Sequence, residues 1–233
     1  IVGVTCAAVI GARIPDLELP PLPAGHAAPA AVTLASTLRD HRRVFLTVGV
    51  GVLLVSAVRA SRQAVIPLWA EHLALAPAVA SLIYGLSGGI DMLVFYPAGK
   101  VMDIKGRRWV AVPSMLIMGA AMLLMPFTTG VVTLLLVALA IGFGNGIGSG
   151  MNMTLGADHS PRHGRAHFLG VWRLMSDIGV SSGPVLLSFL AGTVSLAVGI
   201  ASTGLLALVA AGMLAHWIPR AAVARTAVGK KRS

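Results

Sequence analysis

Five ionisable side chains interrupt long apolar stretches of the sequence. They are Arg59, Arg62, Asp91, Arg173 and Asp177. Ionisable residues in such stretches are costly to bury and mark functional sites by default. At helical spacing Arg59, Arg62 and Gln63 share one face, so they are candidate contacts for an anionic or polar group of a solute. Burial of a carboxylate favours its protonated form, so Asp91 and Asp177 are candidate sites of proton coupling.

The same side chains have two other interpretations. The charges could neutralise one another, with Arg173 paired to Asp177 and Arg59 or Arg62 paired to Asp91. Such pairs would only hold helices in register. Alternatively, Arg59 and Arg62 could lie near the surface of an apolar layer and extend their charged ends to water. Both alternatives stay open at this point.

The stretch "IGFGNGIGSGMNM", residues 141–153, combines glycines with polar side chains. Gly142, Gly146 and Gly150 follow at four-residue spacing, which predicts a ridge of small residues for close helix packing. Asn145 and Asn152 fall on another face, together with Ser149. They could line a solute path or form hydrogen bonds between helices. A dinucleotide-binding loop would need a preceding strand, and this stretch lies inside an apolar run.

The elements that carry these residues are predicted to be transmembrane helices. Hydrophobic residues make up 56% of the 233 residues, charged residues only 11%, and the mean hydropathy is +0.86. So little charge cannot cover a water-facing surface. Six apolar runs are long enough to span a bilayer, at residues 44–68, 76–99, 109–127, 131–156, 166–190 and 194–218. The predicted fold is an all-α membrane protein with six transmembrane helices.

The remaining segments differ in composition from the six runs. Residues 1–12 are apolar but too short to span, and we expect them to be the end of a truncated transmembrane helix. Residues 13–43 contain a Pro- and Ala-rich stretch typical of a linker. We expect 44–218 to form the six-helix unit and 219–233 a basic tail.

The charges predict the orientation of the helices in the membrane. The formal net charge is +10, and the basic residues collect at alternate connections. The positive-inside rule therefore places both ends of the six-helix unit and the linker in the cytoplasm. Nucleic-acid binding would require basic residues on one face, and here they are dispersed, so no nucleic acid is expected as a partner.

A cluster between the second and third runs carries a family resemblance. In "GKVMDIKGRR" the residues Gly99, Asp103, Gly106, Arg107 and Arg108 follow the loop signature of the major facilitator superfamily, and this sequence resembles that family at the matching position. The resemblance departs at Ile104 and Lys105, where the usual basic residue directly after the aspartate is displaced. A carboxylate near a helix end can hold arginines of the loop. The cluster is thus expected to act as a cytoplasmic latch.

A second motif, in the fifth run, is similar to another signature of the family. Gly179, Gly183 and Pro184 stand at its Gly-x-x-x-Gly-Pro spacing, which we assign to helix packing. The resemblance implies a multi-pass transporter of the plasma (inner) membrane. The stump-like start and the basic tail favour the C-terminal half of a twelve-helix protein.

The resemblance implies a function as well as a fold. We expect proton-coupled transport of a small organic solute or drug by alternating access between two six-helix halves, and the arginines favour an anionic solute. The partner would be the missing N-terminal half or a second copy of the chain, within the lipid bilayer. The alternative is a membrane fragment that does not transport by itself. No cofactor or metal is predicted, and no nucleophile with its base is evident, so an enzyme is not expected.

Overall fold

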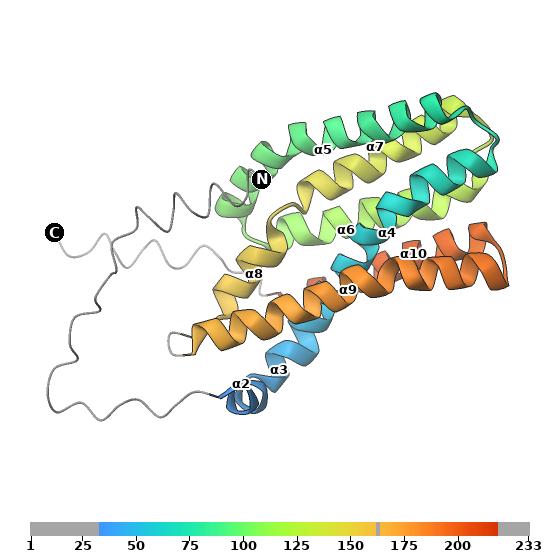
Figure 1. Ribbon diagram of the computed structural model, residues 1–233. Helices are drawn as coiled ribbons and strands as arrows, with labels where there is room; N and C mark the ends of the chain where they lie inside the picture. Colours follow the sequence, from blue (N-terminus) through green and yellow to red (C-terminus); the bar gives the residue numbers. More distant parts are fainter. Residues whose placement is uncertain (1–32, 162–163, 219–233) are drawn as a thin grey trace, which may run out of the picture. The chain divides into compact units, whose positions relative to one another are not determined.

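The computed structural model describes residues 33–161 and 164–218, and the predicted segments 1–12 and 219–233, with most of the predicted linker, lie outside them. Within the described part the chain forms helices and no strand. Six helical segments are long and apolar enough to cross a membrane. The predicted all-α fold with six transmembrane helices is confirmed (Figure 1).

The first span is preceded by a short helix, α2 (Leu34–Asp40). Thr33 caps α2, because its Oγ1 accepts a hydrogen bond of 3.2 Å from the Ser36 amide. The span itself is continuous and consists of α3 (Arg42–Val44), a π-helical turn at Phe45–Gly49 and α4 (Val50–His72). It begins two residues before the predicted bound and ends four after it.

The second and third spans are α5 (Pro77–Lys105) and α6 (Arg108–Leu124). Pro77 stands in the first turn of α5, where its missing amide hydrogen costs nothing. The helix ends at Gly106, whose φ of 95° lies in a region that favours glycine. A 3-10 turn at Met125–Phe127 completes the third span.

The fourth span differs from the continuous helix predicted over 131–156. It is divided into α7 (Val131–Ile147) and α8 (Met151–His159). The break falls at Gly148–Gly150, where Gly150 has a left-handed φ of 79°. A glycine adopts this conformation without the strain that a Cβ would add. The chain therefore changes direction in the middle of the span.

The last two spans are α9 (Arg165–Thr193) and α10 (Leu196–Trp217). A tight connection joins them, and Ser195 caps α10 by accepting a hydrogen bond of 3.2 Å from the Val198 amide. Both spans match their predicted ranges within a few residues.

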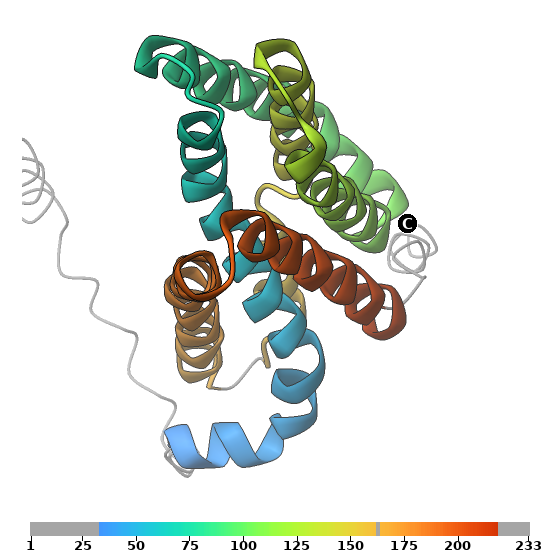
Figure 2. The ribbon, with the colours of Figure 1, turned by 90° about the vertical axis from the view of Figure 1, so that its right-hand side faces the viewer.

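The helices pack so that one side of the bundle is left for a pocket. α4 packs against α9, α5 against α7, and α6 lies between α7 and α10. Figure 2 shows this arrangement from the end of the bundle. Buried side chains of α6, among them Met115, Met118 and Met122, fill the core on the side of α6 and α10. Both of these helices lie away from the pocket described below.

Candidate functional site

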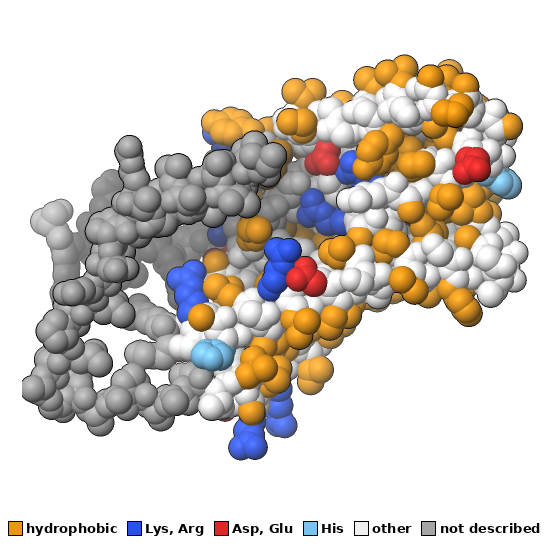
Figure 3. Space-filling view, in the orientation of Figure 1, with side chains coloured by type: hydrophobic (Ala, Val, Ile, Leu, Met, Phe, Trp, Pro, Cys, Tyr) orange, Lys and Arg blue, Asp and Glu red, His pale blue; other side chains and the backbone are white. Residues whose placement is uncertain are grey.

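A pocket of about 740 Å³ opens between α4, α5, α7–α8 and α9. Its volume lies within the range of small-molecule sites. Figure 3 shows acidic and basic side chains gathered on this face, framed by hydrophobic ones. The pocket brings together the solute-contact and proton-coupling candidates predicted from the sequence, namely Arg59, Arg62, Gln63, Asp91, Asn145, Asn152, Arg173 and Asp177.

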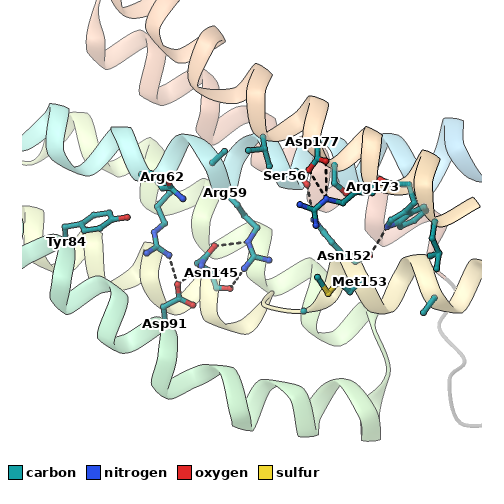
Figure 4. A pocket seen from close by; sticks show the side chains of 18 residues that line it. Ser56, Arg59, Arg62, Tyr84, Asp91, Asn145, Asn152, Met153, Arg173 and Asp177 are labelled. Atoms are coloured by element: carbon teal, nitrogen blue, oxygen red, sulfur yellow. Dashed lines mark hydrogen bonds and ion pairs between the residues drawn. The ribbon is translucent and has the colours of Figure 1, made fainter. Parts of the chain in front are cut away.

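Asp91 of α5 is held by donors from two other helices. Its Oδ2 accepts a hydrogen bond of 2.8 Å from Arg62 Nη1 of α4 and one of 2.6 Å from Asn145 Nδ2 of α7. The Arg62 side chain is only 9% exposed, and its guanidinium lies 5.9 Å from the centre of the Tyr84 ring. Of the alternatives open from the sequence, the geometry has Arg62 paired with Asp91 and facing the pocket (Figure 4).

Arg59 binds the broken end of α7. Its Nη1 donates to the Gly148 carbonyl at 2.7 Å, and its Nη2 donates to the Asn145 carbonyl at 3.1 Å and to Ser149 Oγ at 3.0 Å. Its Nε donates to Asn145 Oδ1 at 2.9 Å. The last carbonyls of a helix lack partners within the helix and carry partial negative charge. Arg59 supplies both the donors and the positive charge that this break requires.

Asn152 of α8 connects α4 with α9. Its Nδ2 donates to Ser56 Oγ at 2.9 Å, and its backbone carbonyl accepts a hydrogen bond of 2.8 Å from Trp172 Nε1. The Asn152 Oδ1 atom is buried and has no partner among the described residues. Asn145 and Asn152 thus line the pocket and form hydrogen bonds between helices, and their role in a solute path stays a prediction.

Arg173 and Asp177 form an ion pair within α9, at 3.0 Å between Nε and Oδ1. Their side chains are 69% and 53% exposed, so the pair lies at the open side of the pocket. Gln63, also exposed, lines the same opening. These three side chains are accessible to a molecule that enters the pocket.

Small residues bring the helices close enough to form this network. A methyl group on Gly146 would lie 2.6 Å from the Asp91 carbonyl oxygen, and one on Gly142 would meet the Ser87 carbonyl. The two glycines therefore hold α7 against α5, beside Asp91. Gly150 differs from the predicted ridge, because a methyl group there would contact nothing within 4 Å and the residue instead forms the break.

Two glycines of α9 allow this helix to pack closely against α4, as the glycines of α7 do against α5. Methyl groups on Gly179 and Gly183 would meet the carbonyls of Leu53 and Ala57. Pro184 follows inside α9 without ending the helix. This close contact places Trp172 and Arg173 beside the pocket.

The predicted latch spreads over two helix ends. Arg107 Nε donates to Asp158 of α8 at 2.9 Å, and its Nη1 donates to Asp103 at 3.3 Å. The hydrogen bond with Asp158 is the largest cause that raises the pKa of the Arg107 guanidinium above its ordinary value. Gly106 makes the turn at positive φ.

The other two latch residues lie outside that contact. Gly99 was predicted to belong to the loop, but it lies inside α5, more than one helical turn before the helix ends. A methyl group on Gly99 would contact nothing within 4 Å. Arg108 is the first residue of α6 and lines a separate hollow together with Gly212 and His216 of α10. The latch contact therefore consists of Asp103, Arg107 and Asp158.

Sequence reasoning missed several residues of the site. Asp158 is the main partner of Arg107, and Ser56, Tyr84 and Trp172 line the pocket. Asp158 has a sequence signal, because it is an acidic residue in the otherwise basic connection between the fourth and fifth spans. Ser56 and Tyr84 have no sequence signal, because neither is charged and each becomes a pocket residue only through contacts between helices.

Six transmembrane helices around a pocket that holds buried and exposed ion pairs define a multi-pass membrane protein of transporter type. The family model of the Major Facilitator Superfamily matches residues 48–233, and the chain belongs to this superfamily. Comparison with curated proteins gave no match.

Proposed function

We propose that the chain forms one half of a secondary active transporter for small organic solutes, and that solute and protons act in the pocket around Asp91. The observation that carries this proposal is the sharing of Asp91 Oδ2 by Arg62 and Asn145 inside the pocket. A carboxylate that neutralises a buried arginine is a group whose protonation changes the contacts of three helices. Transport rather than catalysis fits membership of the Major Facilitator Superfamily.

The single shared oxygen atom of Asp91 supports the proposed proton coupling. Protonation of Asp91 would remove the charge that balances Arg62 and would weaken both hydrogen bonds to Oδ2. Since the two donors belong to α4 and α7, their release would loosen α5 from its neighbours. A proton could in this way bias one arrangement of the half over another.

An anionic solute is favoured by the charges that line the pocket. Three arginines, Arg59, Arg62 and Arg173, stand against two aspartates, Asp91 and Asp177. The described lining thus has one net positive charge. Each arginine already has a partner, so the excess is modest and would suit a solute with a single acidic group.

We further propose a second six-helix unit over the open side of the pocket, either an N-terminal half or another copy of the chain. The exposed Arg173–Asp177 pair supports this, because charged side chains are costly against lipid. The basic connections favour an orientation with both ends of the six-helix unit in the cytoplasm, and the family resemblance favours the plasma membrane. In that arrangement residues 44–218 are the C-terminal transmembrane half, 13–43 the central linker and 219–233 the tail.

The test is solute-dependent proton flux in inverted membrane vesicles. Uptake and efflux of organic acids, bases and neutral solutes would be measured for the chain alone and for the chain extended by any coding sequence upstream of residue 1. We expect flux in the extended form, and loss of proton dependence in Asp91→Asn. Asp40→Asn, on the exposed α2, is the matched control and should retain it.

Three other results would decide between the alternatives of the proposal or contradict it. Activity of the chain alone would select a second copy of the chain as the covering unit and would contradict the need for an N-terminal half. Proton-coupled transport by Asp91→Asn would exclude Asp91 as the coupling site. Absence of transport in both forms would favour a membrane fragment that does not transport.

A further inference from the structure

Asn145 is the side chain that joins Asp91 to Arg59 by hydrogen bonds. Its Nδ2 donates to Asp91 Oδ2 at 2.6 Å, and its Oδ1 accepts a hydrogen bond of 2.9 Å from Arg59 Nε. Figure 4 shows the three side chains next to one another. Among the residues that the structure describes, no hydrogen bond or ion pair links Asp91 to Arg59 directly. The two charged groups are therefore connected through one neutral amide.

The other charged side chains of the described pocket lining have partners of their own. Arg62 donates to Asp91 at 2.8 Å, and Arg173 and Asp177 form their ion pair within α9. Asp91 is thus the carboxylate that faces the arginines of α4. A change in its charge acts on α4 through Arg62 and on α7 through Asn145.

The break between α7 and α8 separates two segments that lie against different helices. α7 lies against α5, where a methyl group on Gly146 would be 2.6 Å from the Asp91 carbonyl oxygen. α8 lies against α9, where a methyl group on Gly156 would be 2.8 Å from the Trp172 ring. The break at Gly148–Gly150 is therefore the joint between the α5 side and the α9 side of the pocket.

Arg59 of α4 holds this joint. Its Nη1 donates to the Gly148 carbonyl at 2.7 Å, and its Nη2 donates to the Asn145 carbonyl at 3.1 Å. The third donor, Nε, is oriented by Asn145 Oδ1. Because a guanidinium is planar, the direction of Nε also fixes the directions of both Nη atoms. The orientation of the Asn145 amide therefore affects how Arg59 binds the joint.

Neutralisation of Asp91 weakens the contact that orients this amide. A hydrogen bond to a carboxylate is roughly twice as strong as one between neutral groups. When Asp91 is neutral, Asn145 Nδ2 is held more weakly, and Asn145 Oδ1 is then a less fixed acceptor for Arg59 Nε. The joint in this way loses part of what determines its angle.

We propose that Asn145 is the positioning residue through which the charge of Asp91 sets the angle between α7 and α8. This inference rests on the proposed function in taking Asp91 as the group that is protonated. It adds the path by which a proton acts, from Asp91 through the Asn145 amide to Arg59, and from Arg59 to the Gly148 carbonyl. The α8–α9 side of the pocket would then move relative to the α5–α7 side.

The test measures the angle of the joint with a pair of spin labels and requires no transport. Leu136 of α7 is 62% exposed, and Ala157 of α8 is also exposed. Leu136→Cys and Ala157→Cys are labelled in the full chain in a Cys6→Ser background. The two positions are 21 residues apart, which is about 31 Å in a straight helix and suits pulsed EPR. A change of about 20° at the joint would move the far end of α8, about 13 Å long, by about 5 Å.

Asp91→Asn represents the neutral state of the carboxyl group. We expect it to shift the mean distance between the labels by about 2–5 Å in the otherwise native chain. In Asn145→Leu, which removes the amide but keeps the backbone carbonyls that Arg59 binds, Asp91→Asn should cause no shift. Asn145→Ala is a second, smaller substitution that should behave alike. A residue that only supports the fold would change the distance by itself and would leave the effect of Asp91→Asn unchanged.

Asn152→Ala is the matched control. Asn152 is the other asparagine of this span and of the pocket, and its side chain donates to Ser56 rather than to Asp91. The shift caused by Asp91→Asn should remain in this variant. An equal shift with and without the Asn145 amide overturns the inference, because the charges would then act on each other through space. So does the absence of a shift in the native chain, or its loss in Asn152→Ala.

The result is distinguishable from that of the proposed function. A shift that depends on Asn145, together with proton-coupled transport by Asp91→Asn in vesicles, would leave the inference standing and contradict the proposed function. Loss of proton dependence in Asp91→Asn, together with a shift that does not depend on Asn145, would do the opposite.

Discussion

At the scale of single residues, Asp91 decides the stability of the pocket. Its carboxylate balances the guanidinium of Arg62, which is almost fully buried. Breaking a buried ion pair from one side leaves an uncompensated charge, which costs more than removal of both charges. The intact pair therefore adds little to the stability of the fold, whereas removal of only one of its two charges should destabilise the fold strongly.

Asp91→Asn should therefore lower the free energy of unfolding by about 3–5 kcal/mol. The double variant Arg62→Met with Asp91→Asn should recover most of this loss, since no unpaired charge remains and the amide oxygen still accepts from Asn145. Thermal unfolding of the purified chain in one detergent is the measurement. A double variant less stable than Asp91→Asn alone would contradict this, because the unpaired Arg62 guanidinium would then not be the source of the loss.

Arg107 belongs to the same scale but lies in a different environment. Its side chain is 25% exposed, and its partner Asp158 is 47% exposed. Exposed pairs contribute at most about 1 kcal/mol and weaken with salt. Asp158→Asn should cost about that amount at low ionic strength, and Asp103→Asn less, because Asp158 is nearer and is the larger cause of the raised pKa of Arg107. The measurement is the free energy of unfolding of each variant at about 0.01 M and 1 M salt. Equal losses of stability in Asp158→Asn and Asp103→Asn would contradict the prediction.

At the scale of elements, the fourth span separates what the sequence could predict from what it could not. The six apolar runs predicted the spans, because hydrophobic length alone determines which segments cross a bilayer. The break after Ile147 was not predicted, since Gly148, Ser149 and Gly150 continue the small-residue pattern that precedes them.

The contact that satisfies the break is remote in the chain. Arg59 reaches Gly148 across 89 residues, and no local pattern encodes it. The sequence predicted that Arg59, Arg62 and Asp91 matter as costly charges in apolar surroundings. It left open which arginine pairs with Asp91, because that depends on how α4, α5 and α7 pack.

Gly150→Ala should isolate the contribution of the break. Nothing lies within 4 Å of the added methyl group, so the cost comes from the left-handed φ of 79° alone. That conformation costs an alanine about 1–2 kcal/mol. Gly170→Ala is the matched control, because Gly170 has the same open space but lies inside α9, where alanine is favoured by about 1 kcal/mol. Destabilisation by both variants to the same extent would exclude the backbone as the cause.

At the scale of the whole molecule, the two sides of the bundle meet different surroundings. α6 and α10 are apolar and lie away from the pocket, and their exposed side chains include Leu116, Leu205 and Val209. The opposite side presents the pocket with its charges. We propose that water reaches this second side, under the cover of the second unit, while lipid covers the first.

Cysteine labelling tests this difference between the two sides. In a Cys6→Ser background the chain has no other cysteine, so Ser176→Cys and Leu205→Cys each report one position. Ser176 lines the pocket, whereas Leu205 is 56% exposed on α10. A charged thiol reagent requires water and a thiolate, so Ser176→Cys in native membranes should react roughly tenfold faster or more. In detergent-denatured chain the two should react alike, which controls for the intrinsic reactivity of each thiol. Equal rates in membranes would mean that lipid fills the open side of the pocket, and the ionised pairs at its mouth would then have no solvent to support them.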